Sequence, residues 1–198
     1  MACVRGGSAA VMRRLRNLPD MQATYAVPHD HRLYGHGHHL RVEQTKAVAR
    51  WLAEWKGCVS AADLSCGNGE VLTDLGRVGV TQRHYGDFAP GYDYHGPIEQ
   101  TIEEIPNVDL FICCETLEHL DKPLHTLSRI RDKARYMILS TPVENWNDAN
   151  GEHLWAWSQR GVEHLTSSTG WGILHFTLSD TRPLDGIYTY GIWALEAV

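Results

Sequence analysis

The sequence lacks several features that would place the chain in common classes of protein. It has no run of eighteen apolar residues that could span a membrane, and no short apolar segment of the kind that directs secretion. Its five cysteines are an odd number and contain no C-x-x-C pair, so we expect reduced thiols packed in the core. We therefore expect a cytoplasmic protein.

Positive charge is also scarce. The 198 residues contain 18 Lys and Arg against 24 Asp and Glu, a net charge of -6, whereas broad contact with a nucleic-acid backbone normally needs a basic face. The exception is a small basic arm, because Arg5, Arg13, Arg14 and Arg16 all precede the first acidic residue. We interpret residues 1–24 as a flexible N-terminal arm and residues 25–198 as one domain.

A glycine-rich turn is the most informative motif. An apolar run ends at Asp63 and continues as Leu-Ser-Cys-Gly-Asn-Gly-Glu over 64–70, which predicts a strand, a loop and the start of a helix. Glycines allow a tight turn and let a ligand approach the backbone N–H groups at the helix start. Asp87 follows a second strand-like run, eighteen residues after Gly69, which is the spacing an acid needs to bind ribose hydroxyls. The pattern predicts a nucleoside ligand.

The usual dinucleotide fingerprint is incomplete here. That fingerprint spaces its glycines as G-x-G-x-x-G, whereas this loop has Leu72 where the last glycine would fall. This departure disfavours NAD and FAD, and we rank an NAD-linked oxidoreductase third.

Three segments resemble one family. The Asp-Leu-Ser-Cys-Gly-Asn-Gly stretch at 63–69 resembles the first motif of the class I S-adenosylmethionine (SAM)-dependent methyltransferases, among them the small single-domain proteins of the methyltransferase-11/23 type. Residues 108–120 resemble that family's fourth strand and turn, and 138–142 resemble its fifth strand. With Asp87, four landmarks occur in the family's order.

Periodicity and the resemblance together imply an α/β fold. We expect a Rossmann-like, mostly parallel seven-stranded sheet with helices on both faces and a C-terminal antiparallel hairpin. The expected helices cover 41–56, with Val48, Trp51, Leu52 and Trp55 on the sheet, a segment containing Leu124, Leu127 and Ile130, and 158–169. The expected strands cover 59–64, 82–87, a short segment near Ile98, 109–114, 136–140 ending before Pro142, 172–178 and 188–196.

The resemblance also implies the cofactor and its contacts. SAM would be the methyl donor and S-adenosylhomocysteine (SAH) the product. Gly67, Asn68 and Gly69 would hold the methionine end, Asp87 the ribose and Phe88 the adenine. Glu99, Gln100 and Thr101 are candidates for the adenine amine, with Gln100 and Thr101 preferred. The remaining expected cofactor residues are Asp63, Ser65, Cys66, Cys114 and Glu115.

Histidines are the candidates for acting on the methyl acceptor. If the acceptor is a hydroxyl or an ammonium group, a base must remove a proton, and histidine titrates near neutral pH. His119 follows the fourth expected strand and His153 follows the fifth, so both turns should open at the active-site edge. His153 is the preferred base, whereas His119 could serve the structure or the cofactor side.

A His-rich segment covers residues 25–40. Its H-x-H spacing could chelate a metal, but no cysteine or second ligand group accompanies it, so we predict no metal site. We interpret the segment as a lid over the acceptor pocket, where Tyr25, Tyr34, His36 or Arg41 could contact the substrate.

The acceptor class follows mainly from absent motifs. The turn after the fourth expected strand has no Asp/Asn-Pro-Pro-aromatic motif of amino-methylating DNA enzymes, and the chain has no Pro-Cys nucleophile pair. We therefore expect a small-molecule acceptor and no membrane partner. The runner-up is methylation of a modified nucleotide or nucleic acid through the basic arm. A third alternative is a catalytically silent SAM-binding partner or sensor.

Overall fold

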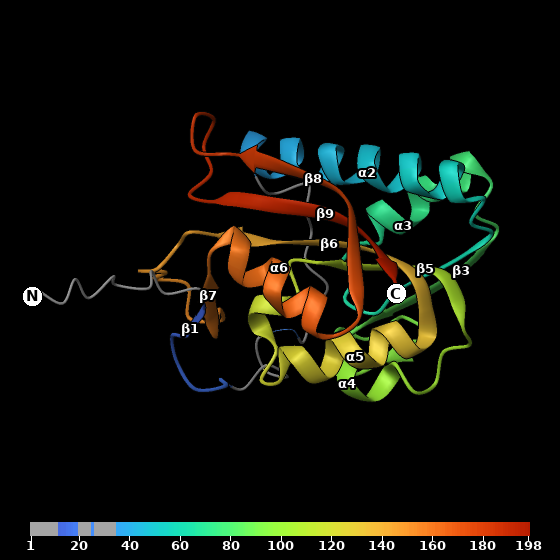
Figure 1. Ribbon diagram of the computed structural model, residues 1–198, viewed down its shortest axis with the longest axis horizontal. Coiled ribbons are helices and arrows are strands. Elements are labelled where there is room, and N and C mark those ends of the chain that lie inside the picture. The colour runs from blue at the N-terminus through green and yellow to red at the C-terminus, as the bar shows by residue number, and fades with distance from the viewer. Residues whose placement is uncertain (1–11, 20–24, 26–34) are drawn as a thin grey trace, which may run out of the picture.

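The computed structural model describes residues 12–19, 25 and 35–198 and is built around one seven-stranded sheet (Figure 1). The strand order is β4-β3-β2-β5-β6-β9-β8. Strands β4, β3, β2, β5 and β6 are parallel to one another, while β9 is antiparallel to both β6 and β8. Their bounds are Ser60–Asp63 (β2), Gln82–Asp87 (β3), Tyr94–His95 (β4), Val108–Cys114 (β5), Ala134–Val143 (β6), Trp171–Asp180 (β8) and Thr189–Ala197 (β9). This arrangement confirms the predicted fold class.

Helices cover both faces of the sheet (Figure 1). On one face, α2 (His36–Lys56), α3 (Glu70–Asp74) and the 3-10 helix η2 (Leu75–Val78) bury Leu52, Leu72 and Leu75 against the strands. On the other, α4 (Ile98–Thr101), α5 (Pro123–Lys133) and α6 (Gln159–Ser168) bury Ile98, Leu127 and Leu165. None of the helices in the described part of the chain is long and apolar enough to cross a bilayer.

Helix α2 begins at His36, five residues before its predicted start. The carboxylate of Asp185, in the connection between β8 and β9, accepts hydrogen bonds from the backbone N–H groups of His36 (2.7 Å) and Gly37 (2.6 Å). These bonds satisfy two of the donors that a helix leaves unpaired at its start. Residues 36–40 of the predicted lid are therefore helical, and 26–34 lie outside the described residues.

The predicted inner face of α2 needs a correction. Val48 and Leu52 are buried as expected, but Trp51 and Trp55 are exposed. Their rings stack on each other with centroids 5.1 Å apart, and Trp51 also packs on His175 of β8. Trp51 and Trp55 are four residues apart at the margin of the apolar stripe, so they lie on the same solvent-facing side of the helix.

Smaller corrections concern single residues of the predicted elements. Ile98 does not form a strand: it begins α4, and the short strand is β4. Leu124 of α5 is exposed rather than buried. Pro142 does not end its strand, because β6 runs to Val143 with Pro142 opposite Tyr190 of β9. Pairing with β5 has already ended at Ser140, so Pro142 lies where β6 has a neighbour on one side only.

Part of the predicted flexible arm is also folded. Residues Met12–Arg14 form β1, which pairs antiparallel with β7 (Trp155–Trp157) in a separate two-stranded sheet. The Arg14 side chain bonds to Asp121 (2.5 Å), and its guanidinium lies over the Trp155 ring. The exposed edge of β7 thus orders residues that look unstructured in the sequence.

Candidate functional site

The candidate site is a cavity of about 680 Å³ at the carboxyl edge of the parallel strands. The chain runs outward from β2 to β3 and β4 and then returns to β5 on the other side of β2, so strand order reverses between β2 and β5. Ligands of open α/β sheets bind at such reversals. The residues that follow β2, β3 and β5 all contribute to the lining, and so do Leu18 and Pro19 from the segment after β1.

The glycine-rich loop supplies one wall. Gly67 and Gly69 have positive φ angles of 56° and 73°, which favour glycine. A Cβ on Gly69 would also lie 3.0 Å from the Tyr85 ring, so both the turn and the packing require glycine there. The loop brings the backbone of Gly67 and Asn68 to the cavity, whereas Gly69 shapes the turn without lining it.

Asp87 holds this loop in place. Its two carboxylate oxygens accept hydrogen bonds from the backbone N–H groups of Gly67 (2.8 Å) and Ala89 (2.9 Å). Each carboxylate oxygen has two lone pairs, so acceptor capacity remains for a ligand. The second acid, Asp63 at the end of β2, accepts from the Ser65 backbone N–H (3.1 Å), and burial raises its pKa to about 7.

The end of β5 forms a second part of the lining. The hydroxyl groups of Ser65 and Thr116 lie 2.6 Å apart and join the loop after β2 to the turn after β5. Glu115 has a positive φ of 53°, accepts a hydrogen bond from the Ser140 hydroxyl (2.8 Å), and lies 3.7 Å from the Arg41 guanidinium. Burial raises the pKa of Cys114 to about 12, so this thiol is protonated at neutral pH, as a core thiol would be.

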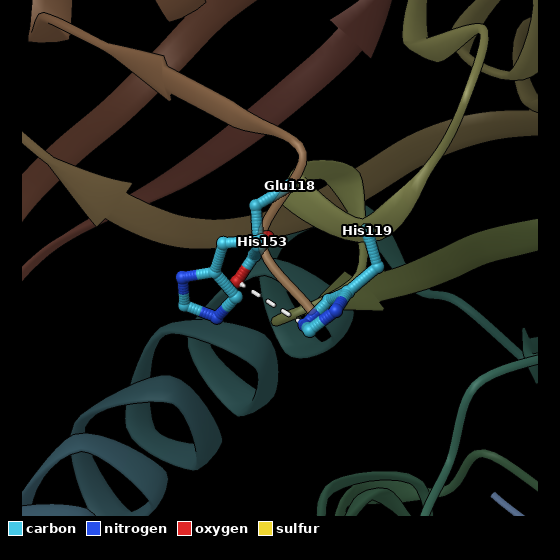
Figure 2. Close-up of side chains that lie close together, drawn as sticks. All are labelled: Glu118, His119 and His153. Atoms are coloured by element: carbon cyan, nitrogen blue, oxygen red, sulfur yellow. Dashed lines mark ion pairs between the residues drawn. The ribbon is translucent and has the colours of Figure 1, made fainter. Parts of the chain in front are cut away.

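Three side chains converge at one end of the cavity. Glu118 and His119 lie in the 3-10 helix η3 (Leu117–His119), and His153 comes from the segment before β7 (Figure 2). One ligand atom of each lies within 4.8 Å of the others. Glu118 is 1 % exposed, and burial together with the charge of Glu115 raises its pKa well above the ordinary range.

Aromatic and basic side chains complete this end. The Tyr25 hydroxyl donates to Glu152 (2.6 Å), and its ring stacks on Phe88 at 6.3 Å. Arg41 is buried with its guanidinium over the Tyr190 ring. Of the residues predicted to contact the substrate, Tyr25 and Arg41 line the cavity, His36 pairs instead with Asp185, and Tyr34 lies outside the described residues.

Most of the predicted site residues meet in this cavity. Those that line it are Asp63, Ser65, Cys66, Gly67, Asn68, Asp87, Phe88, Cys114, Glu115, His119 and His153. Gln100 and Thr101 do not: Gln100 is on the exposed side of α4, and the buried Thr101 hydroxyl bonds back to the Pro97 carbonyl. The turn of α4 presents Ile98 and Glu99 in their place.

Several lining residues carry no recognisable sequence signal. Glu118 reads as part of a turn, and Asn150, Glu152, Tyr188 and Tyr190 come from loops and from the start of the last strand. For the cluster of Glu118, His119 and His153, the only sequence signal is the adjacent Glu-His pair at 118–119 followed by a later histidine.

No family model and no curated sequence matches the chain. Solved structures do. A magnesium protoporphyrin IX methyltransferase from Synechocystis PCC 6803 with bound SAH is 15% identical over 81% of this chain and 85% of that one, with a TM-score of 0.62. A SAM-dependent methyltransferase from Archaeoglobus fulgidus is 16% identical over 78% and 94%, with a TM-score of 0.59. The chain has the fold of the class I SAM-dependent methyltransferases.

The class I methyltransferase fold leaves the reaction open. A [4+2]-cyclase, SpnF, also matches, with 12% identity over 77% of this chain and 80% of that one and a TM-score of 0.58. Function therefore has to be argued from the side chains of the cavity.

Proposed function

We propose that the protein binds SAM and transfers its methyl group to a small-molecule acceptor, releasing SAH. One observation carries the proposal: the glycine-rich loop, Asp87 and the pair His119 and His153 line one cavity. A nucleoside site and a set of groups able to act on an acceptor thus share a space whose volume is typical of ligand pockets.

The cofactor would lie along the loop after β2. Asp87 would accept hydrogen bonds from the ribose hydroxyls with the lone pairs that Gly67 and Ala89 leave, and Phe88 would pack on adenine. Gly67 and Asn68 would hold the methionine end, and Asp63 would line the same part of the cavity. For the adenine edge we now assign Glu99, which lines the cavity.

The acceptor would lie between the methionine end and the convergent histidines. In methyl transfer the acceptor lone pair forms a bond to the methyl carbon while the carbon–sulfur bond breaks, so the sulfonium becomes a thioether and the acceptor loses a proton. Positioning in line supplies much of the rate. We assign activation of the acceptor to His153 and His119, which line the cavity on this side.

Two arginines of the N-terminal arm, Arg14 and Arg16, favour a small molecule over a nucleic acid. Arg14 pairs with Asp121, and Arg16 donates to the Asp148 carbonyl (2.6 Å). Both guanidinium groups thus bind the protein itself. Phosphate contacts need basic side chains directed outward.

Methyl transfer from labelled SAM tests the proposal. The protein is incubated with methyl-labelled SAM and cell extract, and the label is counted in the small-molecule and nucleic-acid fractions. We expect label in the small-molecule fraction, with one SAH released per methyl. Label in nucleic acid would support the runner-up, and SAM binding without any transfer would indicate a silent binding protein.

A further inference from the structure

The cluster of Glu118, His119 and His153 has a feature that methyl transfer by itself does not need. Two imidazoles and one carboxylate from two separate segments lie close together, with one ligand atom of each within 4.8 Å of the others (Figure 2). Glu118 Oε2 accepts a hydrogen bond from the Thr141 hydroxyl (3.0 Å), whereas Glu118 Oε1 has no hydrogen-bond partner within the described residues. A fully buried carboxylate oxygen without a hydrogen bond is costly, and a bound ion would satisfy it.

Both histidines are oriented as metal ligands usually are. His153 Nδ1 lies 2.6 Å from Asp148 Oδ2, so a proton on Nδ1 would bond to this carboxylate and leave Nε2 as the ligand atom. His119 Nδ1 lies 3.2 Å from the Glu152 carbonyl, which can only accept, and 3.3 Å from the Tyr25 hydroxyl, which already donates to the Glu152 side chain. A proton on Nδ1 of His119 suits both partners. Metal-binding histidines typically donate the second ring N–H to a carboxylate or a backbone carbonyl. His153 has the carboxylate of Asp148 as this partner, and His119 has the backbone carbonyl of Glu152.

The distances fit a single ion. His119 Nε2 lies 3.9 Å from Glu118 Oε1, and all three ligand atoms lie within 4.8 Å of one another. Ligand atoms bound to one ion at about 2.0–2.2 Å are about 3.4 Å apart in a tetrahedral site. Small side-chain rotations would therefore close the cluster on an ion.

The charges nearby leave room for a cation. The Arg41 guanidinium pairs with Glu115 Oε1, at 3.7 Å, and acts on Glu118 only through space, while Glu118 Oε1 has no hydrogen bond within the described residues. A divalent ion would supply the positive charge that this buried carboxylate lacks.

We propose that Glu118, His119 and His153 bind a divalent first-row transition-metal ion, with Asp148 positioning His153. Two imidazoles favour Zn²⁺, Co²⁺ or Fe²⁺ over Mg²⁺ and Ca²⁺, which prefer oxygen ligands throughout. Three protein ligands beside a cavity leave a coordination position open for another molecule. This proposal replaces our expectation from the sequence that the chain holds no metal.

The role of the ion rests on the proposed function. An acceptor oxygen in the open position would lose its proton to solvent at lower pH, because a bound cation stabilises the anion. The oxygen lone pair would then attack the methyl carbon as the carbon–sulfur bond breaks. No oxidant or reductant is needed.

Cobalt titration of the purified chain tests the site directly, without any activity measurement. We expect one Co²⁺ per chain by equilibrium dialysis and visible d–d absorption bands from a nitrogen and oxygen ligand set. His119→Asn and His153→Asn should each weaken Co²⁺ binding by more than about 100-fold, and Asp148→Asn by about 10- to 100-fold. Glu118→Gln, which keeps the side-chain shape, should weaken it comparably to the histidine variants.

Surface histidines supply the matched control. His125 and His164 are both exposed and do not line the cavity that holds the cluster, so the double variant His125→Ala/His164→Ala should bind Co²⁺ as the wild type does. Thermal unfolding of each variant checks that it is folded. Wild-type binding in His119→Asn and His153→Asn would overturn the proposal, and so would loss of binding in His29→Ala/His31→Ala, a pair from the His-rich segment outside the described residues.

SAM titration separates the two proposals. Cobalt binding without SAM binding would leave the metal site standing and refute the cofactor site. SAM binding without cobalt binding would support the cofactor site and refute the metal site.

Discussion

Replacement of Asp87 by alanine is the sharpest test of the nucleoside site. One charge-assisted hydrogen bond to a ribose hydroxyl contributes about 1.5 to 3 kcal/mol. Since about 1.4 kcal/mol corresponds to a factor of ten, Asp87→Ala should raise the Kd for SAM by about 10- to 100-fold. The variant also removes the acceptor for the backbone N–H groups of Gly67 and Ala89, so the free energy of unfolding should fall by about 1 to 3 kcal/mol.

Asp109 provides a control that separates affinity from stability. Its carboxylate also accepts two backbone N–H bonds, from Val59 (2.9 Å) and Ser60 (3.0 Å), but it lies near the start of β5, away from the carboxyl edge. Asp109→Ala should lower the free energy of unfolding similarly and leave the SAM Kd unchanged. Calorimetric titration and chemical denaturation of both variants give the four values needed. Equal SAM affinity in Asp87→Ala and the wild type would refute the assignment of Asp87 to ribose.

Three further predictions follow from the geometry. Gly69→Ala should lower the free energy of unfolding in chemical denaturation by about 1 to 2 kcal/mol more than Gly79→Ala, because both have positive φ but only Gly69 adds a close contact, to the Tyr85 ring. His153→Ala should lower methyl turnover and leave the calorimetric SAM Kd unchanged, and equal turnover would remove it from acceptor activation. Burial raises the pKa of Asp63 to about 7, so between about pH 4 and 7 the folded state holds a proton that the unfolded chain releases. The free energy of unfolding should therefore fall as pH rises through that window, less steeply in Asp63→Asn, and identical slopes would contradict the raised pKa.

The sheet and the loop after β2 could be predicted because their signals are local. The glycine turn at 67–69, the acid at 87 and the apolar run of β5 each encode one strand end, and parallel strands bring those ends to one edge. Alternating strands and helices then determine the layers.

The remaining features depend on contacts between distant segments. The start of α2 is set by Asp185, about 150 residues later, and β1 is ordered by the edge of β7. The cluster of Glu118, His119 and His153 likewise needs the turn after β5 to meet the segment before β7. The turn of α4 places Glu99 at the cavity and leaves Gln100 and Thr101 away from it. The sequence does not determine which of these three consecutive residues faces the cavity.

Parallel calorimetric titration of the wild-type chain with SAM, SAH and NAD tests the central claim most directly. The account predicts that SAM and SAH each bind at one site per chain and that NAD does not bind. Binding of NAD alone, or of none of the three, would contradict it.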